Sequence, residues 1–103
     1  MNPSDLLAEI SAFQPHNGDW RPLGELLGQL WSAGVAQEGL PVLFGVFERY
    51  PEEDGAGVLW SVVHGVESLN LDYGQSLRDS MSRQASLMGR IMLDRLERSI
   101  AAG

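Results

Sequence analysis

The chain has 103 residues with no cysteine and no lysine, and 44% of its residues are hydrophobic. A chain of this length is expected to form one domain, over residues 1–103. The absence of cysteine excludes a disulfide scaffold and a thiolate metal site. The net charge of −7 argues against nucleic acid as a partner, because phosphate contacts need clustered cations.

The acidic charge is concentrated in the first part of the chain. Residues 1–74 contain eleven acidic residues and two arginines, a balance of −9, whereas residues 75–103 contain three acidic residues and five arginines, a balance of +2. An acidic surface favours a basic partner, because opposite fields accelerate encounter and help to select the partner.

Neither a secretion signal nor a membrane segment is expected. The residues from Met1 to Asp5 contain no basic flank and no apolar core. The longest apolar run, from Leu40 to Phe47, is far shorter than the roughly 20 residues that a membrane helix needs. We therefore expect a cytoplasmic protein that does not contact the membrane.

Helical periodicity is clear in the first third of the chain. A first helix is predicted to start at Pro3 and Ser4 and to stop at the turn signals of residues 14–18. Its inward stripe comprises Leu6, Leu7, Ile10 and Phe13. A second helix, closed near Gly34, has apolar residues at i, i+3, i+4, i+7 and i+8. These are Leu23, Leu26, Leu27, Leu30 and Trp31.

The middle of the chain predicts two more helices. The third runs from near Glu38 to Tyr50, with Pro41 tolerated in its first turn, and it is apolar nearly all round, as a central helix is. The fourth is predicted to start at an Asp54–Gly55 cap and to end near Ser68. Its expected buried face comprises Leu59, Val62, Val63, Val66 and Leu69.

An alternative assigns strands to residues 40–47 and 58–63, because valine and phenylalanine favour sheets. Neither stretch alternates polar with apolar residues, and neither is followed by a two-residue hairpin turn. We therefore predict an all-α fold.

Two helices are predicted in the last third. The fifth has an Asp72-x-x-Gln75 start resembling a capping box. Its inward residues are Tyr73, Leu77 and Met81. The sixth, from about Ser86 to Ala101, carries a stripe of Met88, Met92 and Leu96, with Leu93 and Ile100 beside it. Two i, i+4 pairs, Asp79 with Arg83 and Asp94 with Arg98, are typical of a solvated helix face. Six helices with short links favour three antiparallel hairpins, in a compact bundle.

The strongest candidate for function lies at the start of the fourth helix. Three acidic residues precede its first turn, and we name Glu52, Glu53 and Asp54 the acidic turn. On its flank, at i, i+4 and i+7, stand Trp60, His64 and Glu67, which we name the aromatic flank. An aromatic anchor with a charged rim is typical of the centre of a protein interface, so these six residues are predicted to bind a partner.

Each of these residues also has a structural interpretation. Trp60 can pack on a neighbouring helix, His64 can hydrogen-bond Glu67 or a backbone carbonyl, and Asp54 can serve as a helix cap. These alternatives stay open at the level of sequence.

No catalytic residue, metal or cofactor is expected. His64 and Glu67 at i, i+3 are two ligands, which do not make a metal site, and the only other histidine is His16. The chain has neither a Gly-x-Ser-x-Gly nucleophile motif nor a lysine-containing phosphate loop. A non-enzymatic protein is therefore predicted.

The central segment resembles small immunity proteins of bacterial polymorphic toxin systems, which include contact-dependent inhibition and type VI secretion effectors. The resemblance covers residues 43–98 and is carried by Glu48-Arg49-Tyr50-Pro51-Glu52-Glu53-Asp54-Gly55-Ala56-Gly57-Val58-Leu59-Trp60, by Val63-His64-Gly65-Val66-Glu67, and by Tyr73, Leu77, Ser80, Arg83, Met88 and Arg95. The N-terminal third matches nothing in that pattern.

The resemblance implies a cytoplasmic protein that binds the toxin domain of its own cell or of sibling cells and blocks the active site. It also implies a small HEAT-like solenoid, which presents a curved binding surface. Many toxin domains are nucleases with basic clefts, which an acidic protein can plug. The alternative is a helical adaptor or secretion chaperone that uses the same surface on an ordinary cellular partner.

Overall fold

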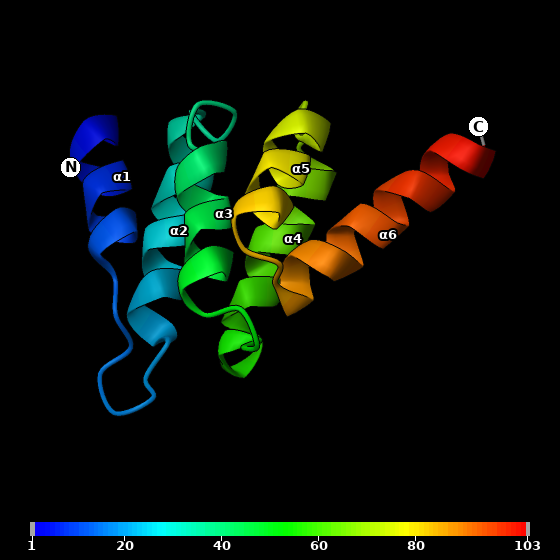
Figure 1. Ribbon diagram of the computed structural model, residues 1–103. Coiled ribbons are helices and arrows are strands. Elements are labelled where there is room, and N and C mark those ends of the chain that lie inside the picture. Colours follow the sequence, from blue (N-terminus) through cyan, green and yellow to red (C-terminus); the bar gives the residue numbers. More distant parts are fainter. Residues whose placement is uncertain (1, 103) are drawn as a thin grey trace.

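A computed structural model describes residues 2–102, and it describes side chains as far as residue 101. That part of the chain is helical and contains no strand, as predicted. Its elements are α1 (Pro3–Ala12), α2 (Arg21–Ala33), α3 (Leu40–Arg49), the 3₁₀ turn η1 (Gly55–Gly57), α4 (Val58–Ser68), α5 (Gly74–Arg83) and α6 (Leu87–Ala102). Successive helices run in opposite directions, as expected for hairpins (Figure 1).

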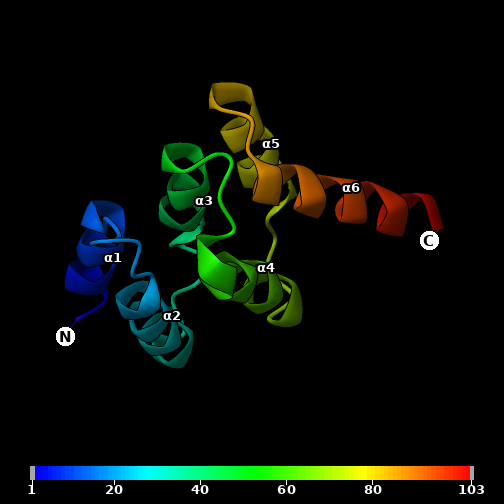
Figure 2. The same ribbon diagram turned by 90° about the horizontal axis from the view of Figure 1, so that it is seen from below.

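The helices form two layers. Seen from below, α1, α3 and α5 lie in one row and α2, α4 and α6 in the other (Figure 2). Within the first row α3 packs on both α1 and α5, and within the second α4 packs on α2 and α6. The pairs α1–α2 and α5–α6 join the rows at the two ends. The radius of gyration is 13.0 Å, close to the ~13 Å of a compact chain of about 100 residues.

The core lies between the two rows and confirms most of the predicted stripes. Helix α3 is central, as its composition predicts, and contributes five of the buried side chains. The largest fully buried side chains are Phe44, Phe47, Leu6, Ile10, Leu23, Leu27, Leu30, Leu40, Leu43, Leu59, Leu77 and Met88.

The start of α4 differs from the prediction. Asp54 accepts a hydrogen bond from the Ala56 N–H at 3.1 Å, so it caps η1, and α4 begins only at Val58. Residues 55–57 have φ angles of 61°, 53° and 91°, which lie in the left-handed region and cannot belong to an α-helix. The predicted buried face holds for four residues, but Leu69 is 48% exposed because it is the C-cap, beyond the last turn of the helix.

The predicted capping box of α5 is wrong. The helix begins at Gly74 after Tyr73, and no side chain caps it. The backbone of Asp72 is bound instead by the Gln37 amide, which donates to the Asp72 carbonyl and accepts from its N–H, both at 2.8 Å. The Gln75 amide donates to Asp79 at 2.8 Å. A long-range contact thus replaces the local one.

Of the two predicted i, i+4 ion pairs, Asp94–Arg98 is confirmed at 2.7 Å. The pair of Asp79 with Arg83 does not form, because Arg83 binds Glu48 of α3. At the start of α6 the Ser86 hydroxyl accepts from the Gly89 N–H at 3.0 Å, as a capping serine does.

A tryptophan of α2 lies directly over a glycine of α4. A Cβ atom on Gly65 would stand 2.4 Å from Cζ2 of Trp31. In an exposed helix, alanine is favoured over glycine by about 1 kcal/mol. Here we expect Gly65→Ala to lower the free energy of unfolding by about 1–3 kcal/mol, because the indole must move. Urea unfolding followed by circular dichroism measures the change.

Gly28, in the middle of α2, is the matched control, because a Cβ atom there would meet nothing within 4 Å. We expect Gly28→Ala to raise the free energy of unfolding by up to about 1 kcal/mol. If Gly65→Ala raised the free energy of unfolding as much as Gly28→Ala does, the close packing of Trp31 on Gly65 would be contradicted.

Candidate functional site

The acidic turn lies on the surface between α3 and η1. All three of its side chains are exposed, and among residues 2–102 none of their carboxylates forms an ion pair. The backbone of the turn is well ordered by hydrogen bonds. The Glu53 N–H donates to the Tyr50 carbonyl, and the Leu59 and Gly57 N–H groups donate to the Asp54 carbonyl, each at 3.1 Å. The turn therefore holds three exposed carboxylates on an ordered backbone, and the carboxylate of Asp54 also accepts the hydrogen bond from the Ala56 N–H.

Aromatic packing fixes this turn from the inner side. The buried ring of Trp20 meets the Tyr50 ring edge-on, with 5.1 Å between centroids. A Cβ atom on Gly55 would lie 2.9 Å from Cε3 of Trp20, so only glycine lets the chain pass this close. Because Trp20 fills the inner side of the turn, the neighbouring acidic side chains point to solvent.

The aromatic flank is a stacked pair on the surface of α4. Trp60 is half-buried and His64 is exposed, and their rings stack with centroids 5.9 Å apart and planes 29° apart. The proposed hydrogen bond between His64 and Glu67 is absent from the described residues. Trp60 also packs on the core, so its structural interpretation is correct in part. The exposed edge of the pair remains free to contact a partner.

Glu67 has a structural role. Its carboxylate lies 2.8 Å from a guanidinium nitrogen of Arg95, which ties α4 to α6. Tyr73 is close to this pair: partial burial and the Glu67 carboxylate raise the pKa of its phenol, while Arg95 acts in the opposite direction. Of the aromatic flank, Glu67 is therefore the residue least available to a partner.

The structure therefore divides the six predicted site residues. Trp60 and His64 touch each other, Glu67 turns to α6, and no hydrogen bond or ion pair in the described residues joins these three to the acidic turn. The acidic turn and the Trp60–His64 stack lie on consecutive segments at the start of α4. Within this surface Asp54 caps η1 and Trp60 packs partly on the core, whereas the side chains of Glu52, Glu53 and His64 are exposed.

A partly buried ionic cluster next to the acidic turn was missed by sequence reasoning. The Glu48 carboxylate accepts from the Ser80 hydroxyl at 2.8 Å and from two nitrogens of Arg83 at 3.0 and 3.1 Å. Burial alone would raise the pKa of Glu48, but the hydrogen bonds from Arg83 and Ser80 and the nearby positive charges hold it below its ordinary value. The cluster joins α3 to α5 and serves the fold.

Arg49, the next residue of the segment that resembles immunity proteins, also serves the fold. Its guanidinium donates to the carbonyls of Ile10 and Phe13, at 3.1 and 3.3 Å, and so satisfies the C-terminal end of α1. This role cannot be predicted from the residues around Arg49, because its partners lie more than thirty residues away in the sequence.

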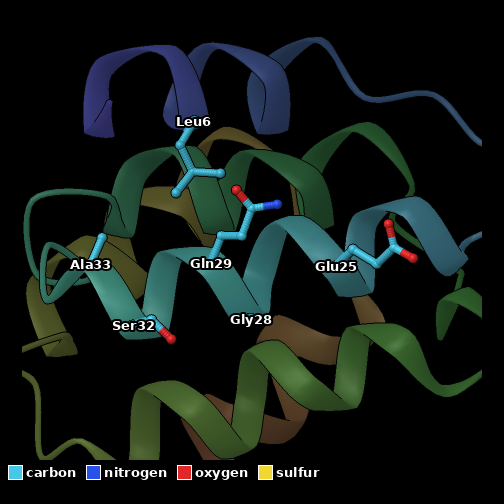
Figure 3. A pocket seen from close by; sticks show the side chains of 6 residues that line it. All are labelled: Leu6, Glu25, Gly28, Gln29, Ser32 and Ala33. Carbon is cyan, nitrogen blue, oxygen red and sulfur yellow. The ribbon is translucent and has the colours of Figure 1, made fainter. Parts of the chain in front are cut away.

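Hollows mark the surface of the described residues, among them the following two. One of about 290 Å³ adjoins the acidic turn. It is lined by Pro51, Glu52, Gln84, Ala85, Ser86, Leu87 and Arg90. The other, about 710 Å³ and open, lies along α2, where Glu25, Gln29 and Ser32 project from successive turns and Leu6 reaches in from α1 (Figure 3). The larger hollow contains none of the predicted site residues, and its walls come from the N-terminal third.

Within residues 2–102, no three histidine, aspartate or glutamate side chains are grouped so that they could hold a metal ion. None of the helices described has both the length and the apolar character to cross a membrane.

Comparison of the chain with protein-family models, with curated proteins and with solved structures found no match.

The cluster of Glu48, Ser80 and Arg83 is expected to make the stability of the protein depend on pH. We expect Glu48→Gln to lower the free energy of unfolding at pH 7 by about 1–2 kcal/mol, because half-exposed Arg83 loses a charged partner. The pKa of Glu48 is lower in the folded chain than in the unfolded chain, where it is about 4.3. Its stabilisation is therefore complete above that value and is lost as the pH falls through the lower, folded value.

We therefore expect the difference in free energy of unfolding between the parent protein and Glu48→Gln to become smaller as the pH falls. Urea unfolding measured at several pH values between 7 and 3 tests this expectation. Glu38→Gln is the control, because that exposed carboxylate has no ion-pair partner in the described chain. A difference that stays constant or grows toward acid would contradict this role for Glu48.

Proposed function

We propose that this chain is an immunity protein that binds and neutralises a cognate bacterial toxin domain in the cytoplasm. It acts by covering the active site of the toxin, without catalysis. The observation that carries the proposal is the exposed acidic turn, whose carboxylates have no ion partner in the described residues, together with the stack of half-buried Trp60 and exposed His64 on the next helix. The resemblance of residues 43–98 to immunity proteins supports the same function.

The physical requirements of such an inhibitor match this surface. A half-buried tryptophan loses little conformational freedom on binding and offers a large apolar area. Free carboxylates on an ordered backbone cost little to reorganise, and they attract a basic cleft. The toxin domain that fits best is therefore a basic one, such as a nuclease that binds phosphates. A tight one-to-one complex is expected.

The structure reduces the number of residues that we propose to contact the toxin. Because Glu67 is held by Arg95 in the free protein, the contacts are assigned to Glu52, Glu53, Asp54, Trp60 and His64. Glu67 forms the edge of the surface and is expected to contribute least.

The test uses the toxin C-terminal domain encoded next to this gene, with binding measured by calorimetry at several salt concentrations. We expect Trp60→Ala to weaken the complex about 30-fold or more, as loss of an interface anchor does. We expect the double variant Glu52→Arg/Glu53→Arg to bind more weakly still and to lose most of the salt dependence.

The control is Asp5→Arg/Glu9→Arg, which makes the same change of net charge on the exposed side of α1. It should retain tight binding if the acidic turn acts locally, and circular dichroism verifies that all variants are folded. If both double variants lost the same binding affinity, the loss would be due to net charge alone, and a local role for the acidic turn would be contradicted. If no toxin domain is encoded nearby and co-purification recovers an ordinary cellular protein, the adaptor alternative replaces this proposal.

A further inference from the structure

The turn between α1 and α2 projects beyond the ends of both helices (Figure 1). Its two central residues, Asn17 and Gly18, are exposed and have φ angles of 51° and 75°. A β-turn with positive φ at both central positions is of type I′, for which Asn-Gly is a preferred pair. A backbone hydrogen bond from the Asp19 N–H to the His16 carbonyl, at 3.0 Å, closes the turn. An exposed turn closed in this way opens locally without unfolding the core.

The backbone nitrogen of Gly18 and the side-chain amide of Asn17 are both unengaged. Within residues 2–102 neither group makes a hydrogen bond. A Cβ atom on Gly18 would meet nothing within 4 Å, so the space around this residue is open. Because glycine has no side chain, its nitrogen can approach the preceding amide without steric hindrance. The turn therefore places an unhindered nucleophile next to an unprotected amide.

We propose that Asn17 is a modification site, at which the folded protein deamidates without an enzyme. Asparagine is a chemically labile residue, and ring closure between adjacent residues of one chain is unimolecular. The Gly18 nitrogen loses its proton and forms a bond to Cγ of Asn17. The bond from Cγ to Nδ2 breaks, and Nδ2 takes up a proton and leaves as ammonia. The product is a five-membered succinimide ring.

Water is the co-reactant of the second step, in which the ring opens. If water adds to the side-chain carbonyl of the ring, the bond from Cγ to the Gly18 nitrogen breaks, and aspartate replaces Asn17. If water adds to the backbone carbonyl, the peptide bond breaks, and the chain then runs through Cγ as isoaspartate. Direct hydrolysis of the amide gives aspartate alone, so isoaspartate is the signature of the ring.

The other two asparagines of the chain lack one of these features. Asn2 precedes Pro3, whose nitrogen has no proton to lose. Asn70 is exposed and has a φ of 56°, close to that of Asn17, but it precedes Leu71. The side chain of Leu71 hinders attack by its own nitrogen, and it packs on the core. Asn70 therefore separates the effect of the following glycine from the effects of exposure and φ.

The modification changes both charge and backbone at the end of the molecule that carries the acidic turn. Either product adds one negative charge to a chain of −7, next to Asp19 in the sequence. Isoaspartate also adds a methylene carbon to the backbone of a tight turn. This turn leads directly to Trp20, whose ring packs on Tyr50 and lies against Gly55. The added charge makes the modified protein separable from its parent by anion exchange.

The test incubates the purified, folded full chain for several weeks at neutral and at mildly alkaline pH. Cleavage at Glu9, Glu25 and Glu67 then places each asparagine in a separate peptide for mass spectrometry. We expect most of the amide at Asn17 to be lost, with isoaspartate as the larger product, while Asn70 keeps its amide. The loss should be faster at the higher pH, because the attacking nitrogen must first lose its proton.

Gly18→Ala should slow the loss of the amide, because its methyl group hinders the attacking nitrogen. Alanine is strained at a φ of +75°, so circular dichroism verifies the fold of this variant, and the comparison with Asn70 needs no variant. The proposal is overturned if Asn17 keeps its amide as long as Asn70 does. It is also overturned if Asn17 reacts only in urea, because the turn is then closed in the folded protein, or if aspartate is the sole product. None of these outcomes depends on whether the chain neutralises a toxin.

Discussion

The close packing of two tryptophans against two glycines determines how the second row of helices lies and how the acidic turn is presented. Trp31 occupies the space that a Cβ atom on Gly65 would fill, and Trp20 does the same at Gly55. The first contact lets α2 and α4 approach closely. The second lies at Gly55, the first of three left-handed residues between α3 and α4, and the acidic side chains just before it are exposed.

The familiar motif around residues 48–67 therefore combines two kinds of residue. Three of them, Glu48, Arg49 and Gly55, hold the fold, because each contacts a segment that is distant in the sequence. The acidic turn and the exposed edge of the Trp60–His64 stack make no such contact and remain free for a partner. Glu52 also lines the hollow beside Leu87.

Local patterns predicted the helices and most of the core, because periodicity reports which side of a helix is buried. Local patterns gave wrong predictions where a side chain or backbone group binds a residue distant in the sequence and not its expected near neighbour. Arg83 has an acid four residues before it but binds Glu48, and Asp72 is engaged by Gln37 instead of capping α5. Local spacing has the same limit at the candidate site. Spacing placed Trp60 beside His64, but only the packing of α6 on α4 reveals that Glu67 is already paired.

The central claim is that a partner covers the acidic turn and the Trp60–His64 stack. Three tryptophans give three indole N–H resonances, which makes nitrogen–proton correlation spectroscopy the most direct measurement. On addition of the toxin domain that the proposal requires, we expect the indole signal of Trp60 and the amides of residues 52–54 to shift most. The signal of buried Trp20 should change little. Shifts concentrated on α2 around Gln29, with the Trp60 signal unchanged, would contradict the account and place the interface on the N-terminal hollow.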